Sequence, residues 1–182
     1  MAEAIAVPKG HGFRILSERW TAERVQCVIE LLHAGDRAAL VAYLDREVPK
    51  VPHASDPPDL LDLKGFHTGA LPFRVDLGGI TFDRLNLWNA EFEDCNLKSA
   101  TFQKCALGQI HFEESYLRGA RFVGCDLHGA IFIRCNLQRL VLEDSALYFA
   151  TWMECELDVR SFEAGLQDSA LYFATWMECE LD

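Results

Sequence analysis

The chain has 182 residues, half of them hydrophobic, and its 28 acidic and 17 basic side chains give a formal net charge of −11. This length predicts one domain with a small appended unit. The negative charge argues against direct binding to nucleic acid. No segment has the apolar length of a membrane span, and the first residues lack the basic and apolar runs of a secretory signal. We therefore expect a cytoplasmic protein that does not bind membranes.

Residues 21–47 have the apolar spacing of two short amphipathic helices. In the first, apolar residues recur at 25, 28, 29, 31 and 32 between Thr21, a candidate N-cap, and Gly35, a candidate C-cap. In the second, Asp36 is the candidate N-cap and apolar residues recur at 39, 40, 43 and 44. We expect a helical hairpin that plugs one end of the domain that follows. A docking module for a partner is the alternative.

Four prolines in residues 48–58 predict a linker after the hairpin. The N-terminal unit, hairpin and linker together, therefore comprises residues 1–58. Residues 61–74 can be aligned as an irregular first turn of the repeat described next. The second unit is accordingly expected to comprise residues 61–182.

From Val75 to Val159 the sequence repeats every five residues without interruption. The third residue of each unit is Leu, Phe or Trp, and the first is small or aliphatic. Because side chains alternate sides along a strand, the first and third residues point to one side and the second and fourth to the other. Such a ribbon buries its apolar side only by winding and stacking on itself, so the period predicts a solenoid.

The third residues alternate strictly between Leu and Phe from Leu77 to Leu137. If four units make one coil, Phe stacks on Phe and Leu on Leu in successive coils. Ala mostly accompanies Phe in the first position and Cys mostly accompanies Leu, which keeps the volume of each layer nearly constant, as close packing requires. The expected core residues are Phe82, Leu87, Phe92, Leu97, Phe102, Leu107, Phe112, Leu117, Phe122, Leu127, Phe132, Leu137, Leu142, Leu147, Trp152 and Leu157.

The units at 95–99 (CNLKS), 125–129 (CDLHG) and 135–139 (CNLQR) resemble those of the pentapeptide-repeat family. The resemblance implies a mainly β protein, a right-handed quadrilateral parallel β-helix with about one unit per face and four units per coil. The right hand also agrees with the general rule for parallel crossovers. The hairpin would be a small α-helical addition to this pentapeptide-repeat solenoid.

The register of the repeat changes after Val159. Residues 160–163 make a unit that is one residue short, and residues 168–182 repeat residues 144–158 letter for letter. A recent tandem duplication explains the copy, and an error in assembling the chain is the alternative. The last unit is one residue short and no polar cap follows it, although solenoid ends usually carry one. This end predicts either a truncated chain or a homodimer formed through the uncapped C-terminal coil.

The acidity of the chain belongs to the repeat, which has 18 acidic and 8 basic residues from Val75 onward. On the expected face centred on Phe92, Phe112, Phe132 and Trp152, acidic side chains occupy the first two layers and apolar ones the next two. Stacked like charges and exposed apolar side chains both cost stability, so together they indicate a surface for a basic protein partner. The alternative is that this pattern arose by random variation of a polar surface and has no function. The candidate partner-binding residues are Glu91, Glu93, Asp94, Glu113, Glu114, Ile131, Ile133 and Met153.

No catalytic residue, metal site or cofactor is expected, because the six histidines lack ligand spacing and no Cys-x-x-Cys pair or phosphate-binding glycine loop occurs. We expect a non-enzymatic scaffold that binds a protein partner the sequence does not identify. Some pentapeptide-repeat proteins resemble duplex DNA in shape and charge and act on DNA gyrase, so the resemblance implies DNA mimicry as the alternative. This chain differs from them in its short rod and interspersed Arg and Lys. A non-catalytic part of a longer effector or enzyme is the third interpretation.

Overall fold

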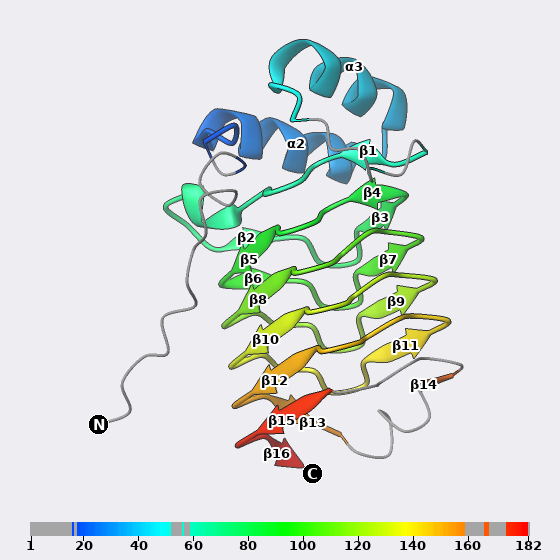
Figure 1. The fold of residues 1–182 in the computed structure, drawn as a ribbon. Coiled ribbons are helices and arrows are strands. Elements are labelled where there is room, and N and C mark those ends of the chain that lie inside the picture. The colour runs from blue at the N-terminus through cyan, green and yellow to red at the C-terminus, as the bar shows by residue number, and fades with distance from the viewer. Residues whose placement is uncertain are drawn as a thin grey trace.

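The computed structural model describes residues 16, 18–51, 56, 59–158, 166–167 and 174–181. In these residues the protein is mainly β, with parallel strands stacked into a solenoid of about five turns and two helices at its N-terminal end (Figure 1). The solenoid predicted from the five-residue period is confirmed. Within the same residues, no helix combines the length and the hydropathy that crossing a membrane requires.

The two helices begin and end at the predicted caps. Helix α2 spans Ala22–Ala34, where the Thr21 side chain accepts a hydrogen bond from the Arg24 amide and Gly35 ends the helix at a φ of 65°. Helix α3 spans Arg37–Glu47, and the Asp36 side chain accepts a hydrogen bond from the Ala39 amide. Both caps satisfy amide groups that the first turn of a helix leaves without partners.

Four stacks of parallel strands form the four sides of the solenoid, and each side is named here by the central residue of an early layer. The Phe92 face contains β5 (Glu91–Glu93), β8 (His111–Glu113), β10 (Ile131–Ile133), β12 (Thr151–Met153) and β15 (Thr175–Met177). The opposite Phe82 face contains β3 (Thr81–Asp83), β7 (Thr101–Gln103), β9 (Arg121–Val123), β11 (Val141–Glu143) and β14 (Leu166–Gln167).

The other two sides are held by shorter pairings. The Leu97 face contains β2 (Val75–Asp76), β6 (Cys95–Asn96), β13 (Glu156–Leu157) and β16 (Glu180–Leu181), joined by single bridges through residues 116 and 136. The Leu87 face contains β1 (Leu61–Asp62) and β4 (Leu85–Asn86), continued by bridges through residues 106, 126 and 146. A 3₁₀ turn, η1 (Thr68–Ala70), lies between β1 and β2.

The coils differ in length at the two ends of the solenoid. In the middle, Val75 lies opposite Cys95, so a coil takes four units of the repeat, as the alternation of Leu and Phe predicted. In the first coil Leu61 lies opposite Leu85, which makes this coil four residues longer than those in the middle. The last coil is longer by the same amount, because Leu142 lies opposite Leu166. The short unit expected at 160–163 lies outside the described residues.

The duplicated segment stacks on its own original. Strand β15 pairs in register with β12, and the rings of Trp152 and Trp176 are parallel with centroids 4.0 Å apart. Identical residues therefore meet across this pair of coils, and the last described coil continues the columns of the coil before it.

The core consists of two columns of stacked phenylalanines that meet edge to face. On the Phe82 face, the rings of Phe82 and Phe102 stack at 4.4 Å and 3°. Across the solenoid, Phe92 meets Phe102 at 6.4 Å and 84°, a favoured aromatic geometry. All the residues from Phe82 to Leu157 that were expected in the core are 2% exposed or less.

The corners of the Leu units depend on left-handed backbone and on the polar second residue. Ala90 donates its amide to the Leu87 carbonyl at 3.0 Å, and Asn89 between them has a φ of 57°. This is the geometry of a type II turn, which favours Gly or Asn at that position. Two units further along the chain, the Asn96 side chain accepts a hydrogen bond from the Lys98 amide at 3.2 Å, so an Asn or Asp second residue helps to hold the corner.

Cys and Ser in the first position of the Leu units satisfy polar backbone groups inside the corners. The Ser145 hydroxyl accepts the Cys125 amide at 3.1 Å and lies 3.2 Å from the Phe122 carbonyl oxygen of the coil above. The Cys125 thiol makes the corresponding contact with the Phe102 carbonyl at 3.3 Å. All seven cysteines are free thiols. These positions therefore do more than fill volume, because an apolar residue would leave a buried carbonyl without a partner.

The helical hairpin covers the N-terminal end of the solenoid. Val25 and Val28 of α2 are fully buried in the same core, and the Trp20 ring meets Phe66 at 5.2 Å and 82°. Two buried cations hold the junction: Arg19 contacts both carboxylate oxygens of Asp62 at 3.1 Å. Lys64 donates to the Val51 carbonyl at 2.6 Å and also pairs with a carboxylate.

We expect Ser145→Ala to lower the free energy of unfolding by about 1–3 kcal/mol, because it leaves the Cys125 amide and a corner carbonyl buried without their partner. Ser145→Cys is the matched control, since Cys occupies the same position in neighbouring coils, and it should lose less. Urea unfolding followed by circular dichroism measures both. An alanine variant as stable as the cysteine variant would contradict this role of the hydroxyl.

Candidate functional site

The candidate residues meet on the Phe92 face, where two outward columns run along the solenoid. The first column places Glu91 opposite His111 and His111 opposite Ile131. The second column is Glu93, Glu113, Ile133, Met153 and Met177, in register from β5 to β15. All eight residues predicted for partner binding therefore lie on this sheet or on its adjoining corner.

The acidic half of the face lies next to the helical cap. Glu93 is directly opposite Glu113 in the neighbouring coil. Asp94 and Glu114 follow them at the corner, where their side chains are 57% and 58% exposed. Neighbouring strands lie about 4.8 Å apart, and like charges directly opposite each other destabilise a sheet. This arrangement costs the isolated protein stability unless cations compensate.

Two arginines at the same corner compensate part of this charge. Arg134 lies 2.5 Å from the Glu113 carboxylate and 3.0 Å from the Glu114 carboxylate. Arg74 lies 3.2 Å from Asp94. Although its partial desolvation lowers the pKa of Arg134, Glu114 and Glu113 outweigh this and raise it above its usual value. The acidic half is thus less negative than its five carboxylates alone would suggest.

Sequence analysis did not assign these arginines to the site. The prediction named Asp94 and Glu114, which are fifth residues of their units, but it left out Arg134, the fifth residue of the unit one coil after Glu114. The signal was present, since Asp94, Glu114 and Arg134 follow one another at intervals of four repeat units. Residues with that spacing share a corner in every coil of regular length.

The apolar half of the face lies further from the cap. Ile131, Ile133 and Met153 are half-buried, and Met177 in the last described coil is 37% exposed. Ile133 follows Glu113 directly in its column, so the change from acidic to apolar takes one strand spacing. The surface therefore presents carboxylates and hydrocarbon side by side.

His111 lies within this surface and was also not assigned to it. Its Nε2 atom is buried without a hydrogen-bond partner in the described residues. Glu91 and Ile131 are its neighbours in the adjacent strands. The imidazole therefore marks the boundary between the acidic and apolar halves.

The geometry gives no support to a reaction centre in the described part of the chain. No group of three or more His, Cys, Asp or Glu side chains there is placed to hold a metal ion. Burial raises the pKa of the Cys95 thiol to about 11, so the thiol is protonated at neutral pH and is a poor nucleophile.

We expect Arg134→Gln to lower the free energy of unfolding by up to about 1 kcal/mol at low salt, because exposed ion pairs contribute little each but this arginine serves two carboxylates. The loss should shrink in about 1 M NaCl, where screening weakens the repulsion among the remaining acids. Chemical unfolding at both salt concentrations measures it. An effect of the same size at both would show that charge compensation is not the role of Arg134.

Comparisons with known proteins found one matching family model and several similar solved structures. A sequence profile described as a pentapeptide repeat region matches residues 73–140 and 97–182. A pentapeptide repeat protein (Rfr23) from the cyanobacterium Cyanothece 51142 is similar, with 15% identity and a TM-score of 0.45, over 66% of this chain and 87% of that chain. A pentapeptide repeat protein from the Arabidopsis thaliana thylakoid lumen has 20% identity and a TM-score of 0.25, over 55% of this chain and 57% of that chain.

QnrB1, a plasmid-mediated fluoroquinolone resistance protein, has 16% identity and a TM-score of 0.23, over 68% of this chain and 90% of that chain. Among curated proteins no sequence matches the chain. The structural likenesses concern the fold alone. The profile match covers more than half of the chain, and four units of a pentapeptide repeat make up one observed coil, from Val75 to its partner Cys95. The chain therefore belongs to the pentapeptide-repeat family.

Proposed function

We propose that this chain is a non-enzymatic scaffold that binds a basic protein partner through the Phe92 face. The observation that carries the proposal is the register of one sheet, in which Glu93 and Glu113 are followed directly by Ile133 and Met153. Two features of this surface cost the isolated protein stability: the repulsion between stacked carboxylates and the exposure of apolar side chains. A partner with a basic rim and an apolar contact would relieve both. It would neutralise stacked carboxylates and remove hydrocarbon from water.

The size of the face limits how the partner binds. Five strands about 4.8 Å apart span roughly 19 Å, and three residues per strand give about 10 Å, so the flat area is ~190 Å². A stable protein interface usually buries about 800 Å² on each partner. The partner must therefore extend over a corner of the solenoid or bind transiently. The corner that carries Asp94 and Glu114 is the one that offers further acidic groups.

Mimicry of duplex DNA is less well supported as a function. A DNA mimic needs an uninterrupted line of negative charge, because the phosphates of duplex DNA carry one charge per about 1.7 Å of helix axis. On this chain the corner column mixes both signs, because Arg74 and Arg134 lie on either side of Asp94 and Glu114 and pair with them. A basic protein with discrete contacts fits this mixture better than a protein that binds duplex DNA.

Charge reversal on the face tests the proposal. We expect Glu93→Lys to reduce capture of the partner at least about tenfold, since it replaces an attraction by a repulsion in the centre of the acidic half. Asp144→Lys is the matched control, because Asp144 lies at another corner in the same left-handed conformation as Lys104 and Arg84. Quantitative pull-down with the full-length chain, followed by identification of the captured protein, measures both.

Equal capture by the wild type and the Glu93→Lys variant would remove the acidic half from the interface. Ile133→Asp examines the apolar half separately and should also weaken capture, because it places a charge where hydrocarbon is expected to be buried. Thermal unfolding of each variant verifies that the fold is retained.

We expect the purified chain to leave supercoiling by DNA gyrase unchanged, even at low ionic strength where electrostatic mimicry would be strongest. A supercoiling assay with increasing protein and decreasing salt provides the measurement. Inhibition, or protection from a quinolone, that weakens steeply with salt would instead favour DNA mimicry.

A further inference from the structure

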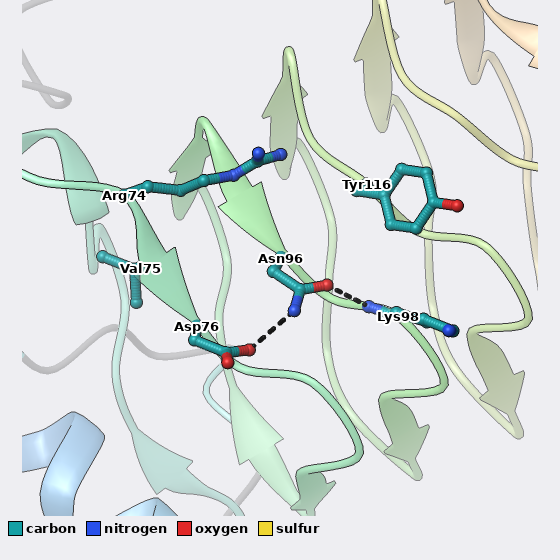
Figure 2. Close-up of a pocket in the computed structure, with 6 residues that line it drawn as sticks. All are labelled: Arg74, Val75, Asp76, Asn96, Lys98 and Tyr116. Carbon is teal, nitrogen blue, oxygen red and sulfur yellow. Dashed lines mark hydrogen bonds between the residues drawn. The ribbon is translucent and has the colours of Figure 1, made fainter.

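A hollow opens on the Leu97 face, around the corner from the acidic surface (Figure 2). Its volume is about 460 Å³, and it is lined by Arg74, Val75, Asp76, Asn96, Lys98 and Tyr116. This lining has two cations and one carboxylate, whereas the chain as a whole has a net charge of −11. The hollow is therefore a local exception to the charge of the molecule.

The cations of the hollow continue into the next coil. The Ser99 amide donates to the Arg118 carbonyl at 3.0 Å, and the Leu97 amide donates to the Tyr116 carbonyl at 2.9 Å. These bonds place Lys98 and Arg118 in neighbouring coils of one column, where the two backbones lie about 4.8 Å apart. Among the residues that the structure describes, neither has a carboxylate within ion-pair distance. Stacked like charges without a counter-ion are unfavourable, and an anion between them would remove this cost.

The one acidic group in the lining is already engaged. The Asp76 carboxylate accepts a hydrogen bond from the Asn96 side chain at 2.8 Å (Figure 2). It also accepts one from the Gly78 amide at 3.0 Å. Arg74 uses its Nε atom for Asp94 at 3.2 Å, so its contact leaves the two terminal nitrogens of the guanidinium for another acceptor.

Glycines keep the approach to the cations open. A side chain at Gly79 would meet nothing within 4 Å, and one at Gly119 would meet only the Ser99 hydroxyl at 3.6 Å. Both glycines have a φ of 69°, which belongs to the corner turns of this face. Solvent therefore reaches the surface above and below Lys98.

We propose that this hollow binds a phosphoryl oxyanion, either free phosphate or a phosphorylated side chain. A phosphate monoester carries a charge of about −1.5 to −2 and three acceptor oxygens, enough to neutralise two cations at once, whereas a carboxylate neutralises one. Lys98 supplies a point charge, and the Arg74 guanidinium supplies paired donors suited to phosphate oxygens. Arg118 does not line the hollow, but it adds a positive charge in the coil next to Lys98. This site lies on a different face from the proposed protein interface and does not depend on it.

The test uses the full chain and inorganic phosphate as the probe. Amide shifts of Gly79, Ser99 and Gly119 are followed by NMR as phosphate replaces chloride at constant ionic strength. We expect saturable shifts, and at least about tenfold weaker binding for the double variant Lys98→Gln and Arg118→Gln. Lys104→Gln is the control, because it removes one exposed charge at a different corner and should change the affinity less than about twofold.

The source of the anion is resolved by a phosphoserine peptide in the same titration. Binding tighter than that of inorganic phosphate supports a phosphorylated partner, and equal or weaker binding supports the free ion. The absence of saturable shifts with both probes overturns the proposal. Equal weakening by the control also overturns it, because the effect would then be a general one of net charge. If the double variant fails to fold, Lys98→Gln alone is compared with the control.

Discussion

Everything in this molecule depends on aromatic and aliphatic side chains that stack at one strand spacing inside a narrow solenoid. Phe82 lies on Phe102 at 4.4 Å, and Phe102 lies on Phe122 at 4.7 Å, distances close to the separation of neighbouring strands. A side chain of another size in one layer would disturb the layers on both sides, because the interior is close-packed and has no free volume to take up the difference. The inward positions therefore leave little freedom, and variation is confined to the exterior.

This constraint turns the surface into columns. Outward residues one coil apart in the middle of the solenoid lie next to each other, so the charge of a column is set by spacing in the sequence rather than by local clustering. The corner that carries Arg74, Asp94, Glu114 and Arg134 separates the acidic Phe92 face from the basic hollow on the Leu97 face. Two surfaces of opposite character thus share one edge, and the ion pairs along that edge keep their charges apart.

The cap limits which surfaces are open to partners. The hairpin buries Val25 and Val28 against the end of the solenoid, and it is held by the pairing of Arg19, only 3% exposed, with Asp62. A buried charge that loses its partner is costly, so this pairing specifies how the hairpin is placed more than it stabilises it. His33 and Arg37 add contacts from the helices to backbone carbonyls of the first coils, at Asp76 and Asp83. The hairpin covers the N-terminal end of the solenoid, and the proposed binding surface lies on one of its flat sides.

The sequence by itself determined the solenoid, its four faces, its core residues and the caps of the two helices, because each of these follows from a short period or a local hydrogen bond. It also brought the eight candidate residues to one face, since a regular period places every outward residue. Only the tertiary structure decided the lengths of the first and last coils, the buried pairing of Arg19 with Asp62 and the pairing of Arg134 with Glu113 and Glu114. These features depend on where coils of irregular length come into register and on which way long side chains turn across a corner, and neither is encoded in the period of the repeat.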